Sequence, residues 1–228
     1  MIINEKQKKV NTCLKSYRRK KKNRIPFSVV FASAAWYPMT GILITLLDEQ
    51  LFFGYDSLKR RDTMERDLQF MDEALRLARE AAAEGEVPVG CVIVRGSEIV
   101  GRGRNRRETK KTALGHAELE AIAEACDKLG GWRLWECTLY VTLEPCPMCA
   151  GAIVNARIPR VVFGASDAKC GACGSVCNLF SMEFNHHPVV EKGVREEEAA
   201  ALLSEFFQQL RVTLRSRPKW KKPENSGN

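Results

Sequence analysis

This sequence lacks the cysteine pattern of a small secreted protein. Its 228 residues include nine cysteines, but the number is odd and the spacing shows no compact disulfide framework. Extracellular scaffolds that depend on disulfides are therefore excluded, and a reducing cytoplasm is the expected compartment. Cys146 and Cys149 form a Cys-x-x-Cys pair, and no second pair of cysteines or histidines stands at the spacing that would complete a four-ligand zinc knuckle around it.

Most of the chain also lacks an excess of charge of either sign. The net charge of +8 arises within residues 1–63, which hold 13 Lys and Arg against 5 Asp and Glu, so residues 64–228 are neutral overall. Any binding of nucleic acid by this larger part must therefore depend on local basic clusters.

The apolar residues predict alternating helices and strands. Leu68, Met71 and Leu75 recur at helical spacing after Met64 and predict an amphipathic first helix, which the run at residues 86–90 ends. We expect strands at 91–94, 98–100, 138–143, 160–163 and 189–190, with a tight turn at Gly96-Ser97, and further helices at 116–126, 147–156 and 196–214. This order predicts an α/β sandwich with a mixed sheet.

The run His116-Ala117-Glu118 and the later run Pro145-Cys146-Pro147-Met148-Cys149 together predict a metal site. One imidazole and two thiolates make three protein ligands, the number that a catalytic zinc uses, whereas a structural zinc takes four. The open position would hold water, and zinc lowers the pKa of bound water from about 15.7 to near 7. Glu118 is placed to move protons beside the ion. This pattern is typical of zinc-dependent nucleobase deaminases, so the predicted chemistry is hydrolytic deamination with one Zn²⁺ per subunit.

The cysteines also allow other interpretations. Cys-x-x-Cys alone more often marks a redox pair or half of a structural zinc site, but its combination with His-x-Glu favours the catalytic site. Cys170, Cys173 and Cys177 form a second cluster in a small-residue loop that lacks histidine. We interpret these three as packing residues, with a second metal or redox site as the alternative.

Two basic clusters are candidates for binding phosphates. One precedes His116 and the other lies near the C-terminus, where Trp220 could stack on a base. Either cluster alone would be interpreted as a solvated loop or tail. Beside a nucleobase-deaminase motif, phosphate binding with release of counterions is the better interpretation. The candidate nucleic-acid contacts are Arg104, Arg106, Arg107, Lys110, Arg211 and Arg215.

The first 63 residues differ from the rest. A basic run at residues 18–24 precedes an uncharged stretch at residues 25–47 that is long enough to span a bilayer. Ala32-Ser33-Ala34 also resembles a signal-peptidase site. An anchor or a signal peptide would place a thiolate–zinc enzyme outside the cytoplasm, where oxidation threatens it and intracellular RNA is absent.

This conflict determines the expected domain organisation. We expect residues 1–63 to lie outside the folded enzyme, with translation beginning at Met64 or Met71, and a membrane anchor as the alternative. No membrane partner is expected unless the extension is present and inserted. The deaminase domain is expected at residues 64–217, followed by a basic disordered tail at 218–228.

From about residue 65 to residue 215 the chain resembles the bacterial tRNA-specific adenosine deaminases, which convert the wobble adenosine of a tRNA anticodon to inosine. The motifs that carry the resemblance are residues 86–90, 103–105, 115–118, 142–152, 162–165 with Asp167, and 198–207. The resemblance implies a three-layer α/β/α cytidine deaminase-like sandwich with a five-stranded mixed sheet. It also implies a homodimer and the tRNA anticodon loop as partner.

The resemblance assigns the site residues as well. It places the zinc on His116, Cys146 and Cys149 and makes Glu118 the proton shuttle. Asn105 would contact the base, because its side-chain amide can donate and accept at once. The remaining substrate-binding positions are Val89 and Leu143, which would wall the base pocket, and Asp167, which would lie near the nucleotide.

The expected reaction is attack of an activated water on C6 of adenine. Glu118 would move a proton from the water to N1 and would then pass a further proton to the departing nitrogen, which leaves as ammonia. An anticodon loop offers a base that is easily unstacked. One alternative is a free-base or nucleoside deaminase acting on guanine or cytosine, which needs no phosphate contacts. The other is an inactive, zinc-stabilised RNA-binding subunit, which would not need Glu118.

Overall fold

The computed structural model describes the backbone of residues 40–216, with side chains from residue 61 to residue 215. The chain divides into two compact units, Met1–Leu58 and Lys59–Asn228. The described elements, in chain order, are α2 (Thr40–Ala83), β1 (Gly90–Arg95), β2 (Glu98–Arg104), α3 (Ala117–Leu129), β3 (Cys137–Leu143), α4 (Pro147–Asn155), β4 (Arg160–Ala165), the 3₁₀ helix η3 (Leu179–Ser181), β5 (Val189–Lys192) and α5 (Glu196–Ser216).

The strands form one five-stranded sheet in the order β2-β1-β3-β4-β5. β1 pairs with both β2 and β3 in the antiparallel sense, whereas β3, β4 and β5 are mutually parallel. The hairpin between β1 and β2 turns at Gly96, whose positive φ of 63° suits glycine. The mixed five-stranded sheet and the turn at Gly96-Ser97 confirm the predictions from the sequence.

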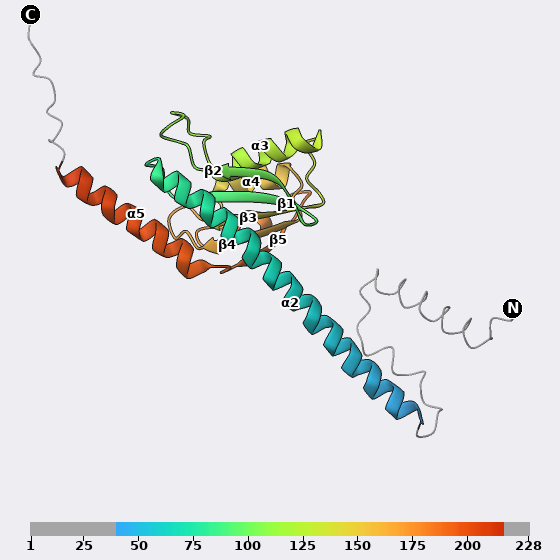
Figure 1. The fold of residues 1–228 in the computed structure, drawn as a ribbon. Helices are drawn as coiled ribbons and strands as arrows, with labels where there is room; N and C mark the ends of the chain where they lie inside the picture. The colour runs from blue at the N-terminus through green and yellow to red at the C-terminus, as the bar shows by residue number, and fades with distance from the viewer. Residues whose placement is uncertain (1–39, 217–228) are drawn as a thin grey trace, which may run out of the picture. The chain divides into compact units, whose positions relative to one another are not determined.

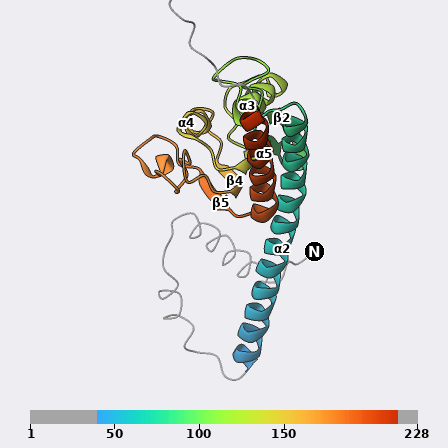
Figure 2. The ribbon, with the colours of Figure 1, turned by 90° about the vertical axis from the view of Figure 1, so that its left-hand side faces the viewer.

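Helices cover both faces of the sheet, which gives the predicted three layers (Figures 1 and 2). On one face, side chains of α3 and α4 such as Ala121 and Ile153 share a buried cluster with Ile93 and Val141. On the other face, side chains of α2 and α5 form a second cluster with alternate residues of the same strands, including Val92. Strands buried on both faces explain why the sequence is so apolar there.

Two glycines let helices approach the sheet closely. A Cβ atom on Gly103 of β2 would lie 2.0 Å from the backbone oxygen of Ala117 at the start of α3. A Cβ atom on Gly90 of β1 would lie 2.0 Å from the backbone oxygen of Ala74 in α2. Only glycine permits these contacts, and the Gly103 contact fixes the first turn of α3, which carries His116 and Glu118.

The first described helix is longer than predicted. The sequence predicts a helix from Met64, whereas α2 begins at Thr40. The last proline before it is Pro38, and no residue from 40 to 63 blocks helical φ/ψ angles, so the helical hydrogen bonds continue upstream of the amphipathic part. Most of the predicted signal or anchor stretch, at residues 25–39, and the predicted tail at 218–228 lie outside the described residues.

Within the described part of the chain, no helix combines the length and apolarity needed to cross a membrane.

Candidate metal centre and substrate pocket

Two helix N-termini bring the motif residues together. His116 is the N-cap residue of α3, and Cys146 is the N-cap residue of α4. Pro147 occupies the first turn of α4, where a missing N–H breaks no helical hydrogen bond. Strand β3 runs directly into this turn, so Cys146 and Cys149 follow the end of a buried strand. The predicted helix starts are therefore confirmed.

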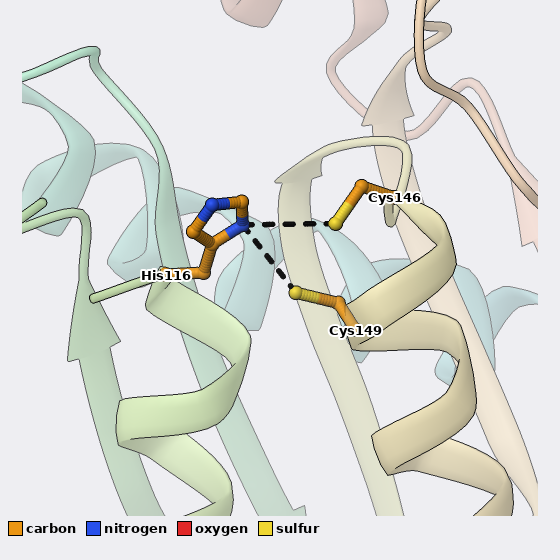
Figure 3. A group of neighbouring side chains, drawn as sticks. All are labelled: His116, Cys146 and Cys149. Atoms are coloured by element: carbon orange, nitrogen blue, oxygen red, sulfur yellow. Dashed lines mark hydrogen bonds between the residues drawn. The ribbon is translucent and has the colours of Figure 1, made fainter. Parts of the chain in front are cut away.

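The three candidate ligands lie at distances that suit zinc (Figure 3). His116 Nδ1 is 3.7 Å from Cys146 Sγ and 3.5 Å from Cys149 Sγ. In the part of the chain that the structure describes, this is the one group of three His, Cys, Asp or Glu side chains close enough to hold a metal ion. Tetrahedral zinc, with bonds of about 2.0–2.1 Å to nitrogen and about 2.3 Å to sulfur, separates such ligands by about 3.6 Å. The residues present therefore fit the ion.

The chemistry of the thiols agrees with this geometry. Hydrogen bonds from Cys149 and His116 lower the pKa of Cys146 to about 4, while the same pairing raises the pKa of Cys149. The free N–H groups and partial positive charge at the start of α4 also favour an anion there. Cys146 is thus a thiolate at neutral pH, which is the form that ligates a metal.

Glu118 lies in the first turn of α3, beside these ligands. Its side chain is buried, with 4% of the residue exposed. Burial raises its pKa to about 6, and the nearby Cys146 thiolate acts in the same direction. A carboxyl group that titrates near neutrality can both accept and deliver a proton, as an acid–base catalyst must.

A pocket of about 550 Å³ opens over this centre. Ligand sites for small molecules typically have volumes of about 300–1,000 Å³, so a nucleoside fits. The predicted site residues that line it are His116, Glu118, Cys146, Asn105, Val89, Leu143 and Asp167. Every substrate position taken from the resemblance therefore borders one cavity; their contacts with a base stay predictions.

Hydrogen bonds hold both the backbone and the side chain of Asn105. Its backbone N–H donates to Val89 O at 2.9 Å, and its side-chain Nδ2 donates to Glu86 Oε2 at 3.2 Å. Glu86 is fully buried and also accepts the backbone N–H groups of Glu108 and Thr109. Burial alone would raise the pKa of Glu86, but these N–H groups lower it on balance, so the carboxylate is ionised.

The candidate nucleic-acid contacts of the first basic cluster are paired with acids. Arg104 pairs with Glu80 of α2 and with Glu84, which directly follows α2. Lys110 and Arg106 both pair with Glu120 of α3. These ion pairs reduce the positive charge that the loop offers to phosphates.

Three of the candidate nucleic-acid contacts stay accessible, one in the first basic cluster and two in the second. Arg107 pairs with its neighbour Glu108 and lines the pocket. Arg211 and Arg215 are exposed along the last turns of α5.

The second cysteine cluster does not form a packed group. Cys173 is half-buried against the core, which agrees with the packing interpretation. Cys170 and Cys177 are exposed, so that interpretation is wrong for these two residues. Cys170 borders the substrate pocket.

Several residues that border the pocket were missed by the sequence reasoning. Glu144 and Lys169 lie on its wall, and α5 contributes Leu203 and Phe207. Glu144 could have been identified from the sequence, because it is a carboxylate directly after the apolar strand β3. Nothing in the periodicity of α5 distinguishes residues that face the pocket from residues that face the core.

Known proteins resemble this chain closely. Residues 65–211 match the model of the MafB19-like deaminase family. The chain is 52% identical over 149 residues to a tRNA-specific adenosine deaminase of Bacillus subtilis, covering 65% of this chain and 92% of the relative. It is 45% identical over 148 residues to a tRNA-specific adenosine deaminase of Streptococcus pyogenes, covering 64% and 93%.

A solved structure agrees with these matches. It comes from work on A-to-I editing by tRNA:A34 deaminases at the wobble position of transfer RNA, and it is 45% identical with a TM-score of 0.58, covering 59% of this chain and 99% of that chain. The family suggested by the motifs is thereby confirmed, together with the fold. The chain belongs to the MafB19-like deaminases and, among them, to the tRNA-specific adenosine deaminases.

Proposed function

We propose that this protein hydrolyses the wobble adenosine of tRNA to inosine and releases ammonia, with one Zn²⁺ per subunit and as a homodimer. The relatives named above act on tRNA, and their similarity extends over nearly their whole length. The observation that carries the proposal is the pocket itself, in which the His116, Cys146 and Glu118 side chains border the same cavity as Asn105.

The residues of the site have separate roles in the reaction. His116, Cys146 and Cys149 would hold zinc, which would supply an activated water as the nucleophile. Glu118 takes a proton from that water and delivers it to N1 of adenine as the bond to C6 forms. It then takes the second proton from the new C6 hydroxyl and passes it to the exocyclic nitrogen, which leaves as ammonia, so adenosine and water give inosine and ammonia.

The pocket walls position the base for this transfer. Val89 and Leu143 provide apolar surfaces that exclude bulk water from the reacting atoms. Asn105 offers a donor and an acceptor to the purine edge. The base must leave its stack to enter, and a single-stranded anticodon loop offers it at low cost.

The test uses the full chain loaded with zinc and a tRNA transcript that carries adenosine at the wobble position. Sequencing should read inosine there, and a transcript with that adenosine moved to a neighbouring position should stay unchanged. Glu118→Gln should retain zinc and lose at least about 10²-fold in rate, as the loss of acid–base catalysis implies.

Other outcomes would decide against the proposal. Full turnover by Glu118→Gln would exclude the proton-shuttle role. A folded, zinc-bound protein that deaminates free guanine or cytosine but not tRNA would favour the free-base alternative, with which the ion pairs of Arg104, Arg106 and Lys110 are compatible. Light scattering on the same sample tests the homodimer.

A further inference from the structure

The carboxylate of Glu144 collects hydrogen bonds from a loop far away in the sequence. Only 2% of this residue is exposed. Its Oε1 accepts the backbone N–H groups of Cys173 at 2.9 Å and Ser175 at 3.1 Å. Its Oε2 accepts the backbone N–H of Asp167 at 3.0 Å and the Ser175 hydroxyl. Four donors from one loop therefore converge on a single buried side chain.

That loop, residues 166–175, forms one wall of the pocket. Ser166, Asp167, Ala168, Lys169 and Cys170 all border the cavity. The side chain of Asp167 is itself engaged, since its Oδ1 accepts the backbone N–H groups of Lys169 and Cys170. The loop has no strand or helix of its own across these positions, so its conformation depends on such contacts.

The loop also lies directly on the turn that leads to the metal ligands. The backbone N–H of Ala172 donates to Pro145 O at 2.9 Å, and Pro145 precedes Cys146. A Cβ atom on Gly171 would lie 2.4 Å from Cδ and from Oε2 of Glu144, so the loop backbone is in full contact with the carboxylate. Glu144 thus connects the turn before Cys146 with the pocket wall that the loop forms.

We propose that Glu144 is a positioning residue for substrate binding, which sets the 166–175 wall at a fixed distance from the metal centre. The inference rests on the proposed function, since it assigns a role within the same pocket. Glu144 touches neither the ligand sulfurs nor the reacting base in this role. It acts through Asp167 and its neighbours, so its loss should weaken the binding of tRNA more than it slows the chemical step.

Glu144→Gln tests this with little change in shape. An amide has one oxygen, so its NH₂ group must replace Oε1 or Oε2. At Oε1 it would face two backbone N–H donors, whereas at Oε2 it faces one N–H and a hydroxyl that can rotate to accept. The NH₂ group will therefore take the Oε2 position, and the Asp167 N–H loses its acceptor.

Hydrogen exchange reads this effect without any assay of activity. In Glu144→Gln the amide of Asp167 should exchange at least about tenfold faster, because a lost hydrogen bond to a charged acceptor favours the open state by about that factor. The amides of Cys173 and Ser175 should change less, and those of β1 and β3 should stay as in the wild type. Uniform acceleration across the sheet would instead mean that Glu144 only stabilises the fold.

Kinetics on the full-length, zinc-loaded protein supply the second readout. KM for the tRNA should rise about tenfold while kcat stays within about threefold and zinc content is unchanged. Asp67→Asn is the matched control, because Asp67 is also a buried carboxylate with several donors but lies on the α2 side of the sheet. It should lower the melting temperature without changing KM.

Three outcomes would overturn the inference: a wild-type KM in Glu144→Gln, an equal rise of KM in the Asp67→Asn control, or unchanged exchange at Asp167. If Glu144→Gln fails to fold, Ser175→Ala removes one of the four donors alone and should raise KM in the same direction, and a wild-type KM there counts against the inference. If the wild-type protein does not deaminate tRNA, the proposed function fails, and the exchange result still decides the role of Glu144.

Discussion

The side-chain amide of Asn105 is partly committed within the protein itself. One of its N–H groups donates to Glu86 Oε2 at 3.2 Å, so the Oδ1 acceptor and the second N–H are left for a ligand in the pocket. The carboxylate of Glu86 cannot donate, and the contact therefore settles which end of the amide is the oxygen. A fixed orientation lets a single residue distinguish one purine edge from another.

Asn105→Ala should lower kcat/KM for the wobble adenosine by about tenfold, as the loss of one or two good hydrogen bonds implies. Its backbone N–H would still bond Val89 O, so the loop should keep its place. Steady-state kinetics on the tRNA measure the effect. Asn178→Ala is the control, because Asn178 accepts the N–H of Phe180 at η3 and does not border the pocket. Equal losses in the two variants would contradict a substrate-binding role for Asn105.

Among the elements, α2 is joined to the sheet by a buried polar cluster. Asp67 of α2 accepts a hydrogen bond from the Tyr140 hydroxyl of β3 at 2.8 Å, and Arg160 of β4 donates to both Asp67 oxygens. Only 4% of Asp67 is exposed. The ring of Tyr140 packs on Phe70 with centroids 5.3 Å apart. These contacts fix how α2 lies on its face of the sheet.

Tyr140→Phe should test this junction through its pH dependence. Burial and the Asp67 carboxylate raise the pKa of the Tyr140 hydroxyl. The pKa of this hydroxyl is therefore higher in the folded state than in the unfolded chain, where a tyrosine has a pKa of about 10. The stabilisation of the folded state by the protonated hydroxyl is fully present below that pH and is lost as the pH rises above it.

Phenylalanine keeps the ring contact and removes the hydrogen bond, so the variant should lose about 1 kcal/mol at neutral pH. Its unfolding free energy should then fall less steeply than that of the wild type above about pH 10. Urea unfolding at several pH values measures both effects. Parallel curves for the two proteins would show that the hydroxyl does not couple to folding.

The elements that sequence reasoning could find are those with local signals. Short apolar runs located the strands, and the positive φ at Gly96 follows from a turn that requires glycine. The metal ligands could also be predicted from the sequence, because the spacing within their motifs places them at the starts of helices. The conformation of the 166–175 loop could not be predicted, since it depends on Glu144, a residue more than twenty positions upstream. The extension of α2 to Thr40 was missed because only its amphipathic part was used.

At the scale of the whole chain, the similarity to the tRNA-specific adenosine deaminases begins close to the first described side chains of α2 that are buried. The family match starts at residue 65. Among the side chains of α2 that the structure describes, those of residues 61–66 are exposed, and Asp67 is the first that is buried, followed by Phe70 and Met71. We therefore propose that residues 1–63 are dispensable for the deaminase domain.

A chain that begins at Met64 should fold and deaminate tRNA with kcat/KM within about threefold of the full-length protein, because the truncation removes no buried side chain of the described part.

A chain that begins at Met71 is the matched comparison. It lacks Asp67 and Phe70, so it loses the polar cluster with Tyr140 and Arg160 and part of the apolar contact with the sheet. Loss of a buried hydrogen-bonded carboxylate together with a buried aromatic residue should cost at least about 3 kcal/mol. Thermal unfolding and inosine formation should separate the two chains. Equal stability would place the packing boundary downstream of Phe70, whereas failure of the Met64 chain would mean that residues before it contribute to folding.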